Sequence, residues 1–296
     1  MRILGGLILL LPLAWVRFLG AGVGFLAWLF LPKVRRQALR NLGNSLGRDY
    51  SRGKRRKICR SMFMHLGIVI AELLWFPRLK PGHLDSLAWV EGLEHLHRVL
   101  REGKGCVFVT PHMGNWELTG AYCAMKGYPL HVIAREIYYE PYNRWLVSLR
   151  SSKGVKTLYR HTRQTFRASL KALARNELIA ILPDQDVDSV DGVFVQFFGA
   201  PAWTPTGPVS MALASGAPIL PAVTVREKGH YKIVLEEPIY VESSGDHRRD
   251  FERYTAQYTR IFEKHIRRHP DQWVWLHKRW KTRQPEVARE AEVQSA

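Results

Sequence analysis

Short apolar runs alternate with helical patterns along most of the chain, and this alternation restricts the folds that it can adopt. The runs of four to seven residues have the length of buried strands, while the longer segments between them repeat apolar residues at helical spacing. Strands that alternate with helices favour an α/β fold with largely parallel pairing. The expected strands are 106–109, 130–134, 155–158, 178–182 and 219–225, and the expected helices are 54–76, 116–125, 142–151, 165–175, 209–214 and 249–269.

One pair of segments departs from the parallel pattern. Residues 223–226 and 231–235 flank a short Glu-Lys-Gly turn, which is typical of a hairpin between antiparallel strands. We therefore expect a mixed central β-sheet flanked by helices. With 296 residues, 46% of them hydrophobic, the chain can bury one large core or two modest ones.

The N-terminal segment is apolar over the length of a membrane helix. Residues 3–31 contain one charged side chain, Arg17, and a helix of this length exceeds the roughly 30 Å hydrocarbon core of a bilayer. Arg17 near its middle, which costs about 2.5–3.5 kcal/mol in a membrane helix, and Pro12 disfavour an uninterrupted span. We expect an N-terminal hydrophobic membrane anchor over 1–32, either a tilted helix or two half-buried segments broken near Arg17. A signal peptide is disfavoured because no cleavage site follows a short apolar run.

A basic segment follows the apolar one. By the positive-inside rule it lies in the cytoplasm, and it would hold the chain to anionic membrane lipids, the alternative being a solvated basic helix face. The net charge of +18 also points to acidic partners. No helix-turn-helix, zinc-finger or RNP signature accompanies the charge, so nucleic acid is not an expected partner. Against Asp49 alone, the basic residues of this segment are Lys33, Arg35, Arg36, Arg40, Arg48, Arg52, Lys54, Arg55, Arg56, Lys57 and Arg60.

His112 is the leading candidate for catalysis, because it follows a predicted buried strand and precedes Glu117 by five residues. If His112 lies in a turn and a helix starts near Asn115, Glu117 lies in the first helical turn and can accept the imidazole N–H. The histidine could then act as a general base toward a hydroxyl. Backbone N–H groups around Gly114 and Asn115 could face a developing oxyanion. The alternative is that both residues merely cap a helix.

Other polar residues allow fewer conclusions. Arg135 and Arg160 each follow a predicted strand and could bind phosphate, unless they are ordinary surface arginines. The Asp-rich stretch 184–191 lacks the glycine and closing glutamate of a calcium loop, and His265 with His269 lacks the glutamate of a zinc helix, so we expect no metal. Two aromatic groups stay ambiguous between a functional surface and core packing: Trp273, Trp275 and Trp280 as a membrane-interface belt, and Phe197, Phe198 and Trp203 as an acyl groove.

Ordered blocks of sequence resemble the bacterial lipid A biosynthesis (lauroyl/myristoyl) acyltransferases, a family of glycerolipid acyltransferase-like enzymes. The His-x4-Glu motif at 112–117 alone is a weak signal, but five blocks in the same order over nearly the whole chain are a strong one. The blocks are His112-Met-Gly-Asn-Trp-Glu117, Ile133-Ala-Arg135, Leu182-Pro-Asp184-Gln185, Val195-Gln-Phe-Phe-Gly199-Ala-Pro-Ala-Trp-Thr204 and Gln272-Trp-Val-Trp275-Leu-His-Lys-Arg279-Trp280.

The resemblance implies a reaction. His112, oriented by Glu117, would deprotonate a hydroxyl of a lipid A precursor, which would attack an acyl thioester on acyl carrier protein without a covalent acyl-enzyme or a cofactor. The chain has no Gly-x-Ser-x-Gly elbow that would supply a serine nucleophile. The residues expected to bind substrate are Gly114, Asn115, Arg135, Arg160, Asp184 and Gln185.

The resemblance also implies partners, a location and a domain division. The partners would be acyl carrier protein, anionic membrane lipids and a phosphorylated glycolipid acceptor, at the bacterial inner membrane with the catalytic domain facing the cytoplasm. An acyltransferase domain would occupy 33–283, and a flexible tail 284–296. Two other functions stay open: acylation of another glycolipid, such as a phosphatidylinositol mannoside, and a catalytically dead membrane module that binds lipid.

Overall fold

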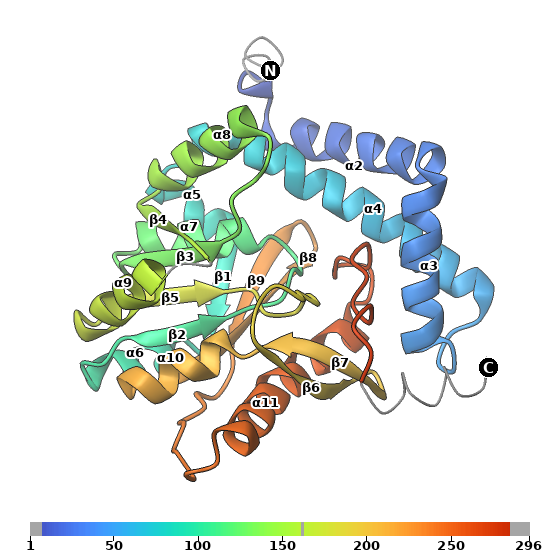
Figure 1. Ribbon diagram of the computed structural model, residues 1–296. Helices are drawn as coiled ribbons and strands as arrows, with labels where there is room; N and C mark the ends of the chain where they lie inside the picture. Colours follow the sequence, from blue (N-terminus) through green and yellow to red (C-terminus); the bar gives the residue numbers. More distant parts are fainter. Residues whose placement is uncertain (1–7, 161–162, 285–296) are drawn as a thin grey trace, which may run out of the picture.

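The computed structural model describes residues 8–160 and 163–284, and in these residues a seven-stranded sheet forms the centre of the molecule (Figure 1). The strand order is β1-β9-β8-β2-β5-β3-β4. The five strands from β8 to β4 pair in parallel, β9 runs antiparallel to β8, and β1 pairs in parallel with β9. The expected mixed α/β sheet and its hairpin are therefore confirmed. The strands are β1 (Ala88–Glu91), β2 (Cys106–Val109), β3 (Leu130–Ala134), β4 (Val155–Tyr159), β5 (Leu178–Ile181), β8 (Ile219–Glu227) and β9 (His230–Leu235).

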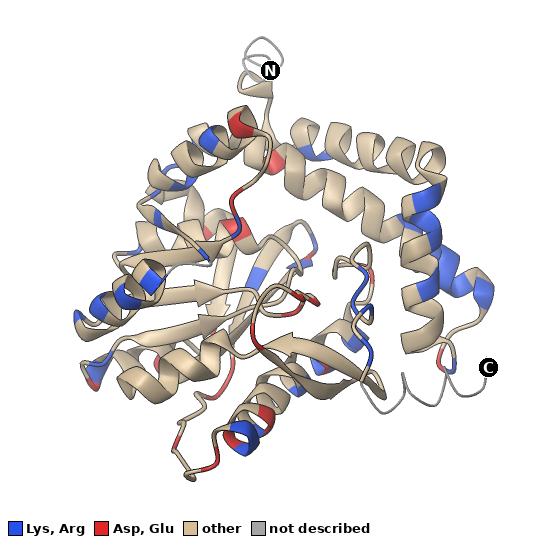
Figure 2. Ribbon diagram, viewed as in Figure 1, with Lys and Arg blue, Asp and Glu red and all other residues tan. Residues whose placement is uncertain are grey.

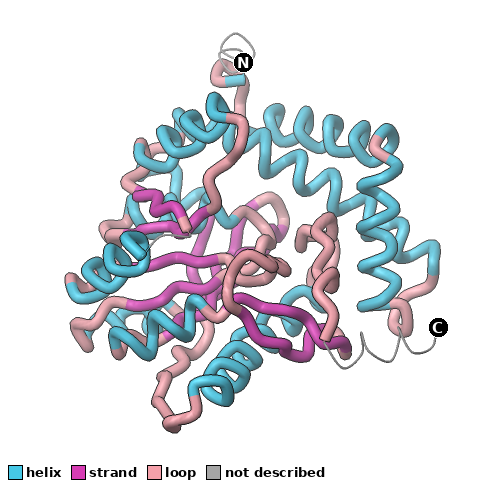
Figure 3. The backbone as a smooth tube through the Cα atoms, viewed as in Figure 1, coloured by secondary structure: helices cyan, strands magenta, loops and turns pink. Residues whose placement is uncertain are grey.

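Three strands were not expected from the sequence. β1 is a four-residue edge strand with one fully buried residue, so it lacks the continuous apolar run of the central strands. β6 (Gly192–Phe197) and β7 (Ala200–Pro205) form a separate antiparallel hairpin. Figure 3 shows this hairpin below and beside the main sheet.

Helices cover both faces of the sheet, and the alternation of side chains along each strand explains how. Cys106 and Phe108 of β2 pack in one core cluster with α6 and α7, whereas Val107 and Val109 pack in another with α9, α10 and α11. The helices are α2 (Leu13–Phe30), α3 (Pro32–Leu46), α4 (Arg52–Trp75), η1 (Phe76–Arg78), α5 (Pro81–Leu87), α6 (Leu93–Arg101), α7 (Trp116–Met125), α8 (Glu140–Ser151), α9 (Arg163–Ala174), α10 (Gly207–Ser215) and α11 (His247–Arg268).

Residues 13–30 of the N-terminal apolar segment form one continuous helix. α2 begins after Pro12 and ends before Leu31, so no break occurs at Arg17. It lies side by side with α4 at the upper right of Figure 1. Among the described residues, α2 and the segment 52–78 are the two helical stretches that are long and apolar enough to cross a membrane, but most of the second is buried in the protein. The domain division stays a prediction, and residues 285–296 of the predicted tail lie outside the described residues.

Candidate active site

Two neighbouring parallel strands bring His112 and Asp184 together. Val109 of β2 is paired with Ile181 of β5, and His112 and Asp184 each follow these paired residues by three positions. The carboxyl ends of parallel strands lie at one edge of the sheet, where ligands of open α/β sheets commonly bind. Strand register therefore places a histidine and an aspartate that are 72 positions apart in contact.

The Asp184 carboxylate holds the His112 ring in one orientation. Oδ1 of Asp184 lies 2.7 Å from Nδ1 of His112, and Oδ2 accepts hydrogen bonds from the His112 backbone N–H and from the Trp273 indole, each at 2.8 Å. Burial raises the pKa of the Asp184 carboxyl, but the charge and hydrogen bonds of His112 outweigh it and keep that pKa below its usual value. An ionised Asp184 accepts the Nδ1–H, which leaves Nε2 to take a proton from a substrate.

Glu117 does not accept the imidazole N–H, and this part of the prediction was wrong. The helix α7 starts at Trp116, whose ring packs edge-on against His112 with centroids 5.2 Å apart. Glu117 is one residue further and points about 100° away around the helix. Its carboxylate accepts hydrogen bonds from Arg150 of α8, with Oε2 2.9 Å from Nε. The two side chains form a largely buried ion pair in the cavity wall.

Gly114 and Asn115 also differ from their predicted role in substrate binding. The Gly114 N–H donates to the Gln272 carbonyl at 3.1 Å, so it does not face an oxyanion. Asn115 is fully buried, accepts the Leu118 N–H at 3.0 Å and donates to Glu72 of α4 at 2.7 Å. Neither residue lines the cavity described below. Their place in the turn explains why: Gly114 supplies the positive φ of 61°, and Asn115 caps α7.

Two polar side chains of α4 contact the turn at 112–115, and neither was predicted to have a role. Glu72 is 4% exposed and binds Asn115. His65, two turns earlier on α4, interacts with the backbone of Gly114, and burial lowers the pKa of His65 to about 4. Both were overlooked because a polar residue within the apolar half of a helix gives no sign of the loop that it faces.

A cavity of about 1020 Å³ opens beside His112. One part is apolar and lies between α7 and the strands, where Phe108, Gly120, Leu130, Val132 and Val155 line it. Gly120 keeps this part open, because a Cβ there would lie 3.9 Å from both Leu130 and Val155. This apolar lining suits a hydrocarbon chain.

The other part of the cavity is cationic. Arg135 follows β3 and Arg160 follows β4, so the same strand edge brings them together, and they line the cavity with Arg163 and Arg167 of α9. Burial and the charge of Arg135 lower the pKa of Arg160. In the part of the chain that the structure describes, no acidic side chain forms an ion pair with these four arginines. Such a cluster is suited to phosphate groups.

The remaining candidates fall into different places. Gln185 lines the cavity, whereas Asp184 lies behind His112 and does not. Trp273 and Trp275 are buried against Phe197 and Phe198, so these side chains are core rather than a membrane belt or an acyl groove.

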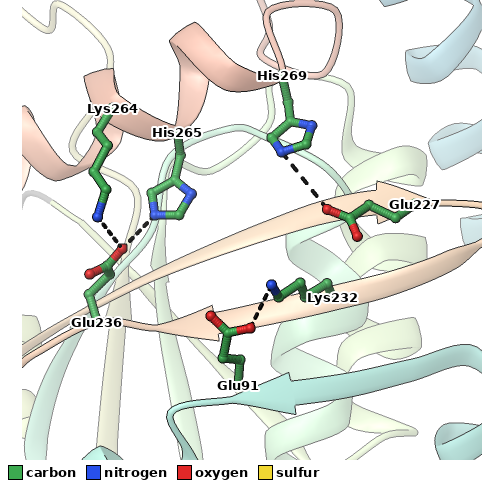
Figure 4. Close-up of polar contacts among 7 residues, drawn as sticks. All are labelled: Glu91, Glu227, Lys232, Glu236, Lys264, His265 and His269. Atoms are coloured by element: carbon green, nitrogen blue, oxygen red, sulfur yellow. Dashed lines mark hydrogen bonds and ion pairs between the residues drawn. The ribbon is translucent and has the colours of Figure 1, made fainter.

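His265 and His269 face two different carboxylates. Figure 4 shows His265 pointing to Glu236, 2.6 Å away, and His269 pointing to Glu227, 3.9 Å away. Burial lowers the pKa of His265, although the hydrogen bond and charge of Glu236 oppose this effect. Among the described residues, no group of three or more His, Cys, Asp or Glu is arranged to hold a metal ion.

A family model and individual relatives of this chain point to the same family. The family model of the bacterial lipid A biosynthesis acyltransferases matches residues 2–282. The chain is 30% identical to a lipid A biosynthesis lauroyltransferase of Escherichia coli, over 94% of this chain and 89% of that protein. It is 28% identical to a lipid A biosynthesis palmitoleoyltransferase of Escherichia coli, over 92% and 87%. A phosphatidylinositol mannoside acyltransferase of Mycobacterium tuberculosis is 27% identical over 64% of this chain and 59% of that protein.

Proposed function

The chain belongs to the bacterial lipid A biosynthesis acyltransferase family and is an acyltransferase, and we propose that it transfers a fatty acyl chain from acyl carrier protein to a hydroxyl of a lipid A precursor. The observation that carries this proposal is the position of His112. The histidine lines the same cavity as the apolar residues and the four arginines. A hydrocarbon thioester and a phosphorylated glycolipid would therefore meet at a general base.

The proposed reaction is a direct transfer. Nε2 of His112 takes the proton of the acceptor hydroxyl while its oxygen attacks the thioester carbonyl carbon. Asp184 stabilises the imidazolium that forms. The N-terminus of α7, which lies beside His112, favours the negative charge on the tetrahedral intermediate. The carbon–sulfur bond then breaks, and the imidazolium returns the proton to the thiol. The products are an ester and free acyl carrier protein, without an acyl-enzyme.

The proposed substrates fit the charges around the cavity. Arg135, Arg160, Arg163 and Arg167 would bind the phosphate groups of the acceptor or of the pantetheine arm. Acyl carrier protein is acidic, so the net charge of +18 would speed its encounter with this chain. We further propose that the protein works at the bacterial inner membrane, with the catalytic domain facing the cytoplasm. The exposed apolar side chains of α2 and the basic residues that follow it support this location.

A phosphatidylinositol mannoside is the second candidate acceptor. It is favoured by the similarity to the mycobacterial enzyme, which covers 64% of this chain. Both acceptors are anionic glycolipids, so the arginine cluster suits either.

The test is acyl transfer by the purified protein in detergent, with lauroyl-loaded acyl carrier protein and a tetra-acylated lipid A precursor. We expect the wild type to form the acylated product and His112→Ala to form none. His247→Ala, at an exposed site on α11, is the control and should keep full activity. The same assay is run with a phosphatidylinositol mannoside as acceptor. If the protein acylates the mannoside but not the lipid A precursor, the mannoside is the acceptor. Product from both wild type and His112→Ala would refute the role of the histidine.

A further inference from the structure

Helix α2 has two faces of different character. Val16, Gly20, Gly24 and Trp28 recur every four residues and are buried, which defines the inner face. The outer face is exposed although it is apolar, and an exposed apolar surface of this extent indicates a binding partner. Its side chains are Trp15, Phe18, Leu19, Val23, Phe25, Leu26, Leu29 and Phe30, each between 38% and 71% exposed.

The inner face of α2 packs closely against α4. A Cβ added to Gly24 would lie 2.2 Å from the Phe63 carbonyl oxygen, and one added to Gly67 would lie 2.2 Å from the Gly20 carbonyl oxygen. The two helices therefore touch through their backbones. Figures 1 and 3 show them side by side over most of the length of α2. Most of α4 is buried in the protein, so α2 is held alongside a buried helix.

Arg17 links α2, through Glu72, to the turn that runs from His112 to Asn115. Its Nε lies 2.6 Å from Oε1 of Glu72, and the other oxygen of Glu72 accepts hydrogen bonds from Asn115 and Tyr231, each at 2.7 Å. A second nitrogen of Arg17 donates to the Gly229 carbonyl at 2.6 Å. The one charge of the apolar segment thus points into the protein. Moving α2 away from α4 would leave the buried Glu72 without its cation, which is strongly unfavourable.

Exposed cations surround the end of α2 that leads into α3. Figure 2 shows them gathered on α3 and on the first turns of α4, next to the apolar helix. An apolar helical face beside clustered Lys and Arg is the pattern of a helix that lies in a membrane interface. The exposed basic residues are Lys33, Arg36, Arg40, Arg48, Arg52, Lys54, Arg56, Lys57 and Arg60.

We propose that α2 lies in the plane of the membrane, with its outer face in the acyl chains of one leaflet and the neighbouring cations on anionic headgroups, and that it does not cross the bilayer. This inference rests on the proposed membrane location and specifies its geometry. A second copy of the chain is a poorer occupant of the same face, because it would bring two clusters of positive charge together.

Tryptophan quenching by lipid tests the geometry. The full-length protein is bound to vesicles of phosphatidylethanolamine and phosphatidylglycerol that carry brominated acyl chains. Trp15 is 60% exposed on the outer face, and Trp28 on the same helix is 8% exposed on the inner face. We expect Trp15→Phe to remove most of the bromine-dependent quenching and Trp28→Phe to leave it unchanged. Loss in both variants would mean that lipid surrounds α2 and would overturn the proposal.

Three further outcomes bear on the geometry, and the first two separate it from the proposed function. This readout needs no acyl transfer, so an inactive protein that shows the expected quenching would refute the function and leave the geometry intact. Vesicle binding without any quenching from Trp15 would overturn the geometry alone. A dimer in detergent that dissociates on Phe18→Ser would identify the outer face as a contact between copies and would also overturn it.

Substitution of Arg17 distinguishes an in-plane helix from a spanning one by a second route. In a spanning helix, Arg17→Leu would favour insertion and leave the catalytic domain unaffected. In the in-plane arrangement it removes the cation of Glu72, so we expect a lower melting temperature and at least a tenfold lower kcat. Arg17→Lys should restore part of both. Full activity and an unchanged melting temperature in Arg17→Leu would contradict the proposal.

Discussion

At the residue scale, two carboxylates near His112 perform different tasks. Asp184 contacts the imidazole directly and stays ionised, whereas Glu117 neutralises Arg150 at the cavity wall. The His-x4-Glu spacing alone suggested that Glu117 orients the ring. A carboxylate in the first turn of α7 cannot turn back toward the preceding residues once Trp116 occupies that side. In the proposed reaction, the oriented base is therefore His112 with Asp184.

Asp184→Asn should lower kcat by about 10³-fold to 10⁴-fold, because an amide neither fixes the Nδ1–H tautomer nor stabilises the imidazolium. The KM for the acyl donor should change little, since Asp184 does not line the cavity. Steady-state kinetics with the purified protein measure both quantities.

Glu117→Gln is the matched comparison. It removes the charge that faces Arg150 in a largely buried pair, so we expect the free energy of unfolding to fall by about 3 kcal/mol. The loss of kcat should be smaller than in Asp184→Asn. A thermally stable Glu117→Gln protein with the larger loss of kcat would reverse the assignment of the two carboxylates.

At the scale of elements, α7 serves both the base and the proposed acyl chain. Its first turn carries Trp116 against His112, and Gly120, one turn later, faces the apolar part of the cavity. The strands β3 and β4 form the opposite wall through Leu130 and Val155. A small residue on the helix therefore sets the depth of the space between helix and sheet.

Gly120→Leu should shift the preferred acyl chain to a shorter one, since the new side chain would occupy the space beside Leu130 and Val155. The measurement is competition among acyl carrier protein thioesters from octanoyl to palmitoyl, with the products separated by mass. Gly43→Leu, at an open position of α3, should keep the wild-type preference. An unchanged preference in Gly120→Leu would place the chain elsewhere.

At the scale of the whole molecule, positive charge is unevenly distributed. The exposed cations of α3 and of the first turns of α4 lie beside the apolar face of α2, and the arginine cluster lines the cavity. Interactions of exposed charges with headgroups weaken as salt rises. Membrane binding should therefore depend on ionic strength, on lipid charge and on which cations are removed.

Replacing Arg52, Lys54 and Lys57 together by Gln should weaken binding to phosphatidylglycerol vesicles roughly 100-fold at low salt, since each basic residue near the surface contributes about 1 kcal/mol. Vesicle sedimentation measures the effect. The triple replacement of Arg253, Arg260 and Lys264 on α11, which are also exposed, is the control and should change binding little. Equal losses in the two variants would assign binding to net charge rather than to this surface.

Local sequence determined much of the molecule. The strands β2 and β3 and the helix α7 have the predicted bounds, because each is set by a run of apolar residues and by a neighbouring cap or turn. The presence of His112 and of the strand-end arginines in one cavity, and the family, could also be predicted, since each depends on residues that are close in sequence. β1 escaped prediction because an edge strand of four residues has no such pattern.

Tertiary structure alone decided which groups meet. The partner of His112 is 72 positions away because β5, rather than β3, lies beside β2. Strand order depends on how the helices pack on both faces of the sheet. The pattern of apolar residues in one strand does not show which strand pairs with it. The same holds for Arg17, since a helix pattern shows an isolated charge but not Glu72, 55 positions away, that neutralises it. The sequence determined the elements and the reactive side chains, and packing decided their partners.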